Sequence, residues 1–189
     1  MRALLVGDVH ATPEELEDCQ RLIDHVVAVA RLRRVGAVVF MGDLYNTHNV
    51  MRVEVLAFWR RAFKTLNDAG LDVYVLVGNH DYAGEGLQIH ALMAHEEQVT
   101  VVDRPMVLGH AGVLMLPYFS DRQAFVEACH VEIQLDGRRV EGGSVLCHQT
   151  FEGSKYENGF YAPDGVEPNL LPQKYVISGH IHTPRRSTK

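Results

Sequence analysis

Apolar residues in the first eighty positions form three short continuous runs, and each run ends at a glycine followed by a polar residue. The runs are ALLVGD at 3–8, GAVVFMGD at 36–43 and DVYVLVGN at 72–79. Continuous apolar runs of this length are typical of strands buried on both faces, as in a parallel sheet. We therefore expect three neighbouring strands that end in polar side chains.

Helical spacing of apolar residues fills the intervals between these runs. Thr12 is followed by Pro13 and two glutamates, which places a capping residue, a proline and negative charge at the start of a helix. Apolar residues then recur at helical spacing as far as Ala30. We expect a second helix over 53–67, with Trp59 on its buried face, and a third over 85–96.

The second half of the chain is predicted to be mostly β. One helix is expected over about 120–129, and the strand-like segments lie at 98–103, 112–118, 131–135, 144–149 and 174–180. The order βαβα followed by strands predicts an α/β (α+β) fold in which two sheets pack face to face with helices outside. With no repeat or long linker in the sequence, we expect one domain over 1–189.

Composition narrows the class of protein. Of the 189 residues 47% are hydrophobic, which is enough for a substantial core, and the net charge is -6. This charge argues against sequence-independent binding of nucleic acid by the bare domain, although bound divalent cations would change the local field. The three cysteines have no metal-site spacing and no stretch approaches a membrane span, so we expect a soluble, cytoplasmic protein with reduced thiols and no membrane partner.

Polar side chains gather where five of the expected strands end. In α/β sheets the carboxyl ends of the strands are where ligands bind, and residues i and i+2 of extended backbone point to the same side. Two carboxylates, one amide and four imidazoles are about the number that two adjacent divalent cations need if one carboxylate bridges them. The candidates are Asp8, His10, Asp43, Asn79, His148, His180 and His182.

These motifs carry a resemblance that runs from residue 8 to residue 182. GDVH, GDLYN, GNHD, a histidine before Gln149 and GHIH, in this order, resemble the calcineurin-like metallophosphoesterase superfamily. The stretches GDLYNTHNV, VLMLPYFS, LCHQTFEGSKYENGF and YVISGHIHTP look most similar to the SbcD-type exonuclease subunits of DNA double-strand-break repair. The resemblance implies a four-layer fold, with two mixed β-sheets packed as a sandwich and flanked by helices.

The resemblance also implies a role for each candidate. Asp43 would bridge two metals, one of which Asp8, His10 and His182 would also bind, while Asn79, His148 and His180 would bind the other. We expect two divalent metal ions, with Mn as the first choice and Fe, Zn, Ni or Mg as alternatives. His80 would be catalytic, and the amide of Asn46, at a position where many family members carry Asp or His, would orient it.

The remaining assignments concern substrate and partners. His48, Arg185 and Arg186 are candidate substrate contacts, and Asp81 is interpreted as structural. We expect a two-metal nuclease acting on DNA, with an SbcC-type ATPase or a second copy of the chain as partner. The alternatives are hydrolysis of small nucleotides or phosphoproteins, and a non-catalytic protein-binding scaffold. Because SbcD-type nucleases continue beyond GHIH, the chain is interpreted as a piece of a longer nuclease or a compact version.

Overall fold

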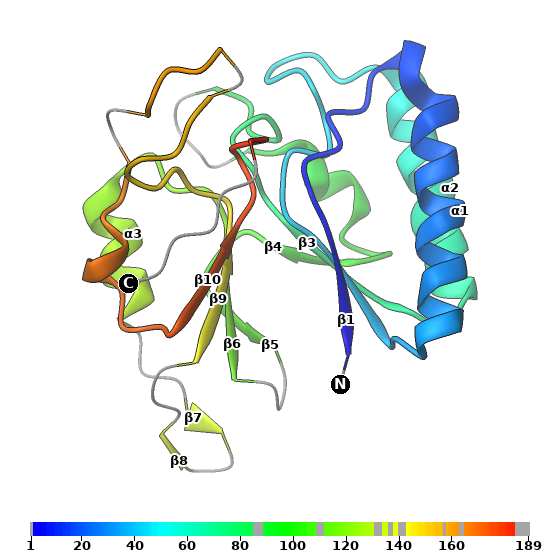
Figure 1. Cartoon of the computed structure of the whole chain (residues 1–189). Coiled ribbons are helices and arrows are strands. Elements are labelled where there is room, and N and C mark those ends of the chain that lie inside the picture. Colours follow the sequence, from blue (N-terminus) through cyan, green and yellow to red (C-terminus); the bar gives the residue numbers. More distant parts are fainter. Residues whose placement is uncertain are drawn as a thin grey trace. The chain divides into compact units, whose positions relative to one another are not determined.

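The computed structural model consists of two compact units, Met1–Val101 and Val102–Lys189, which are described separately (Figure 1). The structure describes residues 2–84, 89–108, 112–130, 134–135, 138–139, 143–156, 158–162 and 165–183. It contains helices and two four-stranded sheets, which confirms the predicted α/β class.

The first unit is built on a sheet in the strand order β1-β2-β3-β4. The three apolar runs form its first three strands, and β2 runs parallel to both β1 and β3. All four residues of β2 are buried, as a continuous apolar run predicts for the central one of three strands. The bounds are Ala3–Val6 for β1, Ala37–Phe40 for β2, Asp72–Leu76 for β3 and Thr100–Val102 for β4.

Two long helices of this unit, α1 (Leu16–Arg33) and α2 (Val53–Asp68), lie beside each other in Figure 1. A 3-10 turn, η1 (Pro13–Glu15), precedes α1 at the predicted start signal. Trp59 of α2 is fully buried, and its ring meets Phe40 of β2 edge-on at 5.6 Å, which confirms its assignment to the core. No helix in the described part of the chain combines the length and apolar character needed to cross a membrane.

The prediction of a third α-helix is wrong for the described residues of that segment, which form a 3-10 helix instead. Residues 85–88 lie outside the described residues, and Ala91–His95 form a short 3-10 helix, η2. Leu92 and His95 of η2 are completely buried. The α-helix was predicted from apolar residues spaced three or four positions apart. A single 3-10 turn also places residues three positions apart on one face, so the same spacing arises without an α-helix.

The second unit contains a mixed sheet in the strand order β10-β9-β6-β5, in which β9 is parallel to β10 and β6 while β5 is antiparallel to β6. Asp121 is the N-cap of helix α3 (Arg122–Cys129), and its carboxylate accepts from two backbone amides of the first turn. The bounds are Met106–Leu108 for β5, Val113–Leu116 for β6, Gln134–Leu135 for β7, Arg138–Arg139 for β8, Ser144–Cys147 for β9, Pro168–Leu170 for the 3-10 turn η4 and Tyr175–Ser178 for β10.

Unit two has its own apolar core between this sheet and α3. Phe125 and Cys129 of α3 pack with Leu114, Val145 and Cys147 of the strands. Strands β5 and β8 were not predicted, and only residues 134–135 of the strand expected over 131–135 are described. Three-residue and two-residue strands are too short to show an alternating pattern in the sequence.

A tyrosine and a histidine form a buried polar pair in the first unit. The Tyr45 hydroxyl lies 2.8 Å from Nε2 of His95, and the His95 ring packs edge-on against Phe63 at 5.1 Å. Burial raises the pKa of Tyr45 and lowers the pKa of His95. The hydrogen bond therefore joins a neutral phenol to a neutral imidazole. This contact anchors the residue that follows Leu44 in the GDLYN motif.

We predict that His95 makes the protein less stable as the pH falls below 6.5. Burial holds the pKa of His95 below its ordinary value of 6.5, so the unfolded chain takes up a proton there before the folded protein does. The stability contribution is therefore complete above pH 6.5 and is lost as the pH falls. Urea denaturation on both sides of this pH measures the loss.

A His95→Gln variant should have lower stability but a flatter pH dependence than the parent chain. His25→Gln is the matched control, because His25 is exposed on α1. An unchanged pH dependence in His95→Gln would contradict the prediction.

Candidate metal centre

The parallel strands of the first unit bring the predicted polar residues to one edge of its sheet. Asp8 and His10 follow β1, Asp43 follows β2, and Asn79 and His80 follow β3. Beyond the strands the first two loops remain hydrogen-bonded, because the amide of His10 donates to the carbonyl of Asp43 at 2.9 Å. The carboxyl ends of parallel strands thus gather the side chains, as expected from the sequence.

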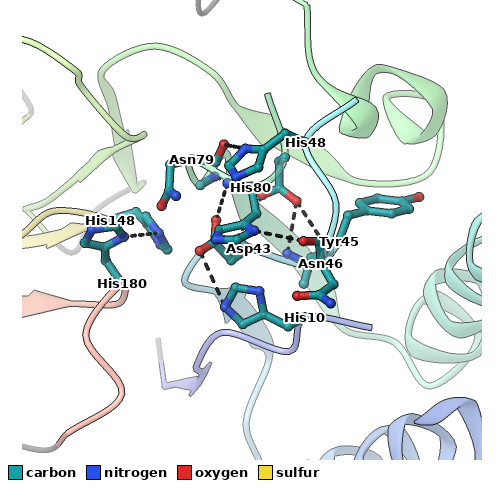
Figure 2. Close-up of polar contacts among 12 residues, drawn as sticks. His10, Asp43, Tyr45, Asn46, His48, Asn79, His80, His148 and His180 are labelled. Atoms are coloured by element: carbon teal, nitrogen blue, oxygen red, sulfur yellow. Dashed lines mark hydrogen bonds and ion pairs between the residues drawn. The ribbon is translucent and has the colours of Figure 1, made fainter. Parts of the chain in front are cut away.

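His10, Asp43 and His80 form a cluster at this edge (Figure 2). One ligand atom from each of the three residues lies within 4.8 Å of the others. The Asp43 side chain is buried, with Oδ2 3.6 Å from Nε2 of His10, and Oδ1 accepts from the backbone amide of His80 at 2.8 Å. The Asp43 carboxylate and the His10 imidazole are donors suited to a divalent transition metal, and His80 lies beside them.

Strained backbone coincides with candidate ligands. Among the described residues, four that are not glycine have positive φ, and three of them are His10 (47°), Asp43 (51°) and His180 (79°). The fourth is Arg34 (52°), the C-cap of α1. Such conformations cost about 1–3 kcal/mol each and persist where the surroundings impose them, typically at functional sites. The backbone therefore singles out ligand candidates independently of their side-chain chemistry.

Asp81 ties together two of the loops that carry the candidates. Its buried carboxylate accepts from four backbone amides: those of Asp43 (2.9 Å), Leu44 (3.0 Å), Tyr45 (3.2 Å) and Gly78 (2.9 Å). Hydrogen bonds to a charged acceptor are stronger than neutral ones. The loop after β2 and the loop after β3 are therefore held in one arrangement by a single side chain, which confirms the structural reading of Asp81.

His80 is oriented by main-chain and ring contacts. Its Nδ1 lies 2.9 Å from the main-chain carbonyl oxygen of Asn46, and the ring of His48 stacks on it with centroids 4.3 Å apart (Figure 2). A carbonyl oxygen only accepts, so Nδ1 of His80 carries the hydrogen and Nε2 is the atom left for chemistry. The orienting atom at Asn46 thus differs from the side-chain amide that the sequence suggested.

His48 has a role in this arrangement that the sequence did not reveal. Its Nδ1 lies 3.0 Å from the carbonyl oxygen of Asn79, and its exposed ring covers one face of His80. The sequence shows only that a histidine stands five residues after the aspartate of GDLYN. This spacing places His48 near the site but does not predict that its ring stacks on His80. The structure makes His48 a neighbour of His80, and its contact with substrate stays a prediction.

The second unit presents its own set of histidines. His148 follows β9 and His180 follows β10, and since these strands are parallel the two residues meet: Nε2 of His148 lies 3.2 Å from Nδ1 of His180. The Tyr118 ring lies 5.8 Å from the His180 ring. His182 is exposed two residues later, while Arg185 and Arg186 lie outside the described residues.

Ser178, which the sequence analysis did not single out, fixes the strand ends that carry these histidines. The amide of Gln149 donates to its hydroxyl at 2.9 Å, and the hydroxyl donates back to the carbonyl oxygen of Gln149 at 2.7 Å. The sequence feature that could have indicated this role is a polar residue at the last position of β10. This reciprocal pair holds together the backbone next to His148 and next to His180.

The donors fit a mixed oxygen and nitrogen metal site without thiolates. Cys147, next to His148, points into the core, where burial raises the pKa of its thiol to about 12. Because thiolates rather than thiols bind metals, this cysteine is unsuited as a ligand at neutral pH. Carboxylate and imidazole donors remain, and they suit Mn, Fe, Zn or Ni.

Comparison with known proteins identifies the family. A model of the calcineurin-like phosphoesterases matches residues 1–184. The chain belongs to the calcineurin-like phosphoesterase family. Calcineurin-like phosphoesterases are hydrolases that use divalent metals, which agrees with the Asp and His cluster of the first unit.

Three viral relatives of this calcineurin-like phosphoesterase match nearly all of its sequence. Exonuclease subunit 1 of Enterobacteria phage T4 is 24% identical over 97% of this chain and 56% of its own length. Protein 078R of Invertebrate iridescent virus 3, whose name assigns it provisionally to the phosphoesterases, is 27% identical over 95% of this chain and 52% of its own length. Protein 244L of Invertebrate iridescent virus 6, named in the same way, is 25% identical over 100% of this chain. The chain therefore spans about half the length of the first two relatives.

Gly78 provides the first test of how tightly the site is built. A Cβ at this position would overlap with Asp43 Oδ1 and with the Asp43 backbone nitrogen. We predict that Gly78→Ala displaces Asp43, lowers the free energy of unfolding by about 1–3 kcal/mol and weakens binding of a divalent metal. Gly36→Ala is the control, because nothing lies within 4 Å of the added Cβ there. Equal stability and metal affinity for the two variants, by urea denaturation and calorimetry, would contradict this prediction.

Asp81 provides the second test. Asp81→Ala removes the shared acceptor of four buried amides, so we expect the free energy of unfolding to fall by about 3 kcal/mol or more, and binding of a divalent metal to weaken. Asp81→Asn keeps one oxygen acceptor and should fall between Asp81→Ala and the parent chain. Asp24→Asn, an exposed carboxylate on α1, is the control. The structural role fails if Asp81→Ala unfolds at the same urea concentration as Asp24→Asn.

Proposed function

We propose that this chain hydrolyses phosphodiester bonds of DNA at a centre of two divalent metal ions, as an SbcD-type nuclease. The observation that carries the proposal is the buried Asp43, held on left-handed backbone between His10 and His80. A carboxylate fixed in this way suits the bridging ligand of a two-metal site. The family assignment supports the same chemistry.

The proposed ligand sets are those expected from the sequence. Asp43 would be shared by both metals. Asp8, His10 and His182 would further hold one metal, and Asn79, His148 and His180 would hold the other. When bound, two such cations would supply positive charge to the attacking and leaving oxygens of an in-line displacement and would activate water near neutral pH. Mn is the first choice of metal, and Fe, Zn, Ni and Mg are the alternatives that the donors admit.

His80 is proposed to supply the proton for the leaving oxygen. Its Nδ1 donates to the carbonyl oxygen of Asn46, so the proton passed to the leaving oxygen would come from Nε2, and the ring would keep its hydrogen on Nδ1. Stacking by His48 restricts rotation of the ring. Asn46 contributes its main-chain carbonyl, and in this role any residue at position 46 with the same backbone conformation would serve.

DNA is proposed as the substrate because the T4 relative is named an exonuclease subunit, and because the sequence carries the SbcD-like stretches. The net charge of -6 does not favour binding of a polyanion by the bare domain. We therefore expect DNA binding to depend on the bound metals, on residues near them and on a partner. An SbcC-type ATPase or a second copy of the chain is the proposed partner, since the T4 relative is named a subunit.

We predict that Asp43→Asn lowers phosphodiesterase activity by about 100-fold or more, on the scale of losing a direct electrostatic contact to the reaction. Purified protein with Mn would be given linear double-stranded DNA, single-stranded DNA, and aryl phosphodiester and phosphomonoester substrates. Calorimetry would measure Mn binding in parallel. Asp68→Asn is the matched control, because Asp68 is an exposed carboxylate on α2 that bonds to Lys64.

The outcomes separate the candidate functions. Cleavage of DNA that is lost in Asp43→Asn supports the nuclease. Cleavage of the aryl esters alone would reject a nuclease for the isolated chain and favour small nucleotides or phosphoproteins as substrates. Full activity in Asp43→Asn would overturn the two-metal centre. No Mn binding and no hydrolysis by the parent chain would favour a protein-binding scaffold.

A further inference from the structure

A narrow hairpin of the second unit displays aromatic side chains. We name its described residues, 154–156 and 158–162, the aromatic hairpin. The amide of Ala162 donates to Ser154 O at 2.8 Å, and the amide of Tyr156 donates to Phe160 O at 2.9 Å. The amide of Gly159, with φ of 85°, closes the turn on Tyr156 O at 2.9 Å. These bonds give the hairpin a defined shape.

Three aromatic rings of the hairpin face solvent. Phe160 is 72% exposed, Tyr161 is 61% exposed and Tyr156 is 41% exposed. The ammonium group of Lys155 lies 4.6 Å from the centre of the Tyr161 ring. Grouped exposed apolar residues mark interaction sites in proteins. Here the exposed rings are accompanied by a positive charge.

The hairpin adjoins two proposed metal ligands. Tyr156 and Asn158 line a pocket of about 460 Å³ together with His180, Ile181 and His182. All of these residues belong to the second unit, so the pocket is a feature of that unit alone. A volume of this order is typical of small-ligand sites. A group bound against Tyr156 would thus lie beside the imidazoles proposed to bind metal.

We propose that the aromatic hairpin is a stacking site for an unpaired base of a nucleic-acid strand whose phosphodiester is bound next to His180 and His182. The inference rests on the proposed function and names the form of its substrate, a single-stranded segment or end. Phe160 and Tyr156 provide exposed aromatic rings, and Lys155, whose ammonium group lies over the Tyr161 ring, adds positive charge to the same hairpin. A platform of aromatic rings with a cationic side chain is the recognised way in which proteins hold unpaired bases without reading their sequence.

Base stacking can be tested without relying on cleavage. The parent chain and Phe160→Ala and Tyr156→Ala variants would be titrated into a fluorescent oligothymidylate, and into an abasic strand of the same length and charge. We expect the parent chain to bind the base-containing strand about fivefold or more tightly, on the scale of one stacked base. Each Ala variant should lose most of this preference while binding the abasic strand unchanged. Phe160→Tyr keeps a ring and should retain the preference.

Control measurements separate this inference from the proposed function. Tyr175→Ala, which removes an exposed tyrosine of β10, should leave the preference for bases intact. Mn-dependent hydrolysis of an aryl phosphodiester by the parent chain tests the proposed function separately, because this activity is measured without any strand or base. Equal affinity of the parent chain for the two strands would overturn the stacking site even where DNA is cleaved. A preference for bases that Phe160→Ala and Tyr156→Ala retain would also overturn it.

Discussion

The arrangement at the sheet edge of the first unit depends on one buried carboxylate. Asp81 accepts from four backbone amides, three in the loop after β2 and one in the loop after β3. Each of these amides would otherwise need another partner in a region that excludes water. With Asp81 in place, Asp43 keeps a left-handed conformation that its side chain does not favour, and its Oδ1 reaches the amide of His80. Gly78 permits this close approach because it has no Cβ.

The hydrogen bonds to Asp81 explain how residues with strained backbone and a cluster of imidazoles can coexist at one edge of the sheet. His10 and Asp43 have positive φ, and a fixed hydrogen-bond network over-determines their backbone. On this backbone, His80 is clamped between the carbonyl oxygen of Asn46 and the ring of His48. Pre-arranged donors avoid reorganisation when a substrate arrives, which is the main source of electrostatic catalysis. In the second unit, Ser178 and Gln149 hold the strand ends beside His148 and His180 by the same means.

Much of the fold and of the candidate site could be predicted because local patterns encode them. The apolar runs at 3–8, 36–43 and 72–79 became parallel strands, and the polar residues after them came to one edge as parallel topology requires. The described part of the helix predicted over 85–96, residues 89–96, could not be predicted correctly, because burial of Leu92 and His95 produces helical periodicity without an α-helix. The atom of Asn46 that contacts His80 could not be predicted either, because a pattern of side chains does not indicate the direction of a main-chain carbonyl oxygen.

The sequence by itself determined the family, the succession of strands and helices up to residue 79, and the identity of the candidate ligands. These properties follow from residue types and short spacings, which are local. Tertiary structure alone decided that His48 stacks on His80, that Asp81 joins two loops 36–38 residues apart, and that Tyr156 lines a pocket with His180 and His182. Such contacts join residues distant in the chain. Their geometry depends on how loops close and pack, which no local pattern of residues records.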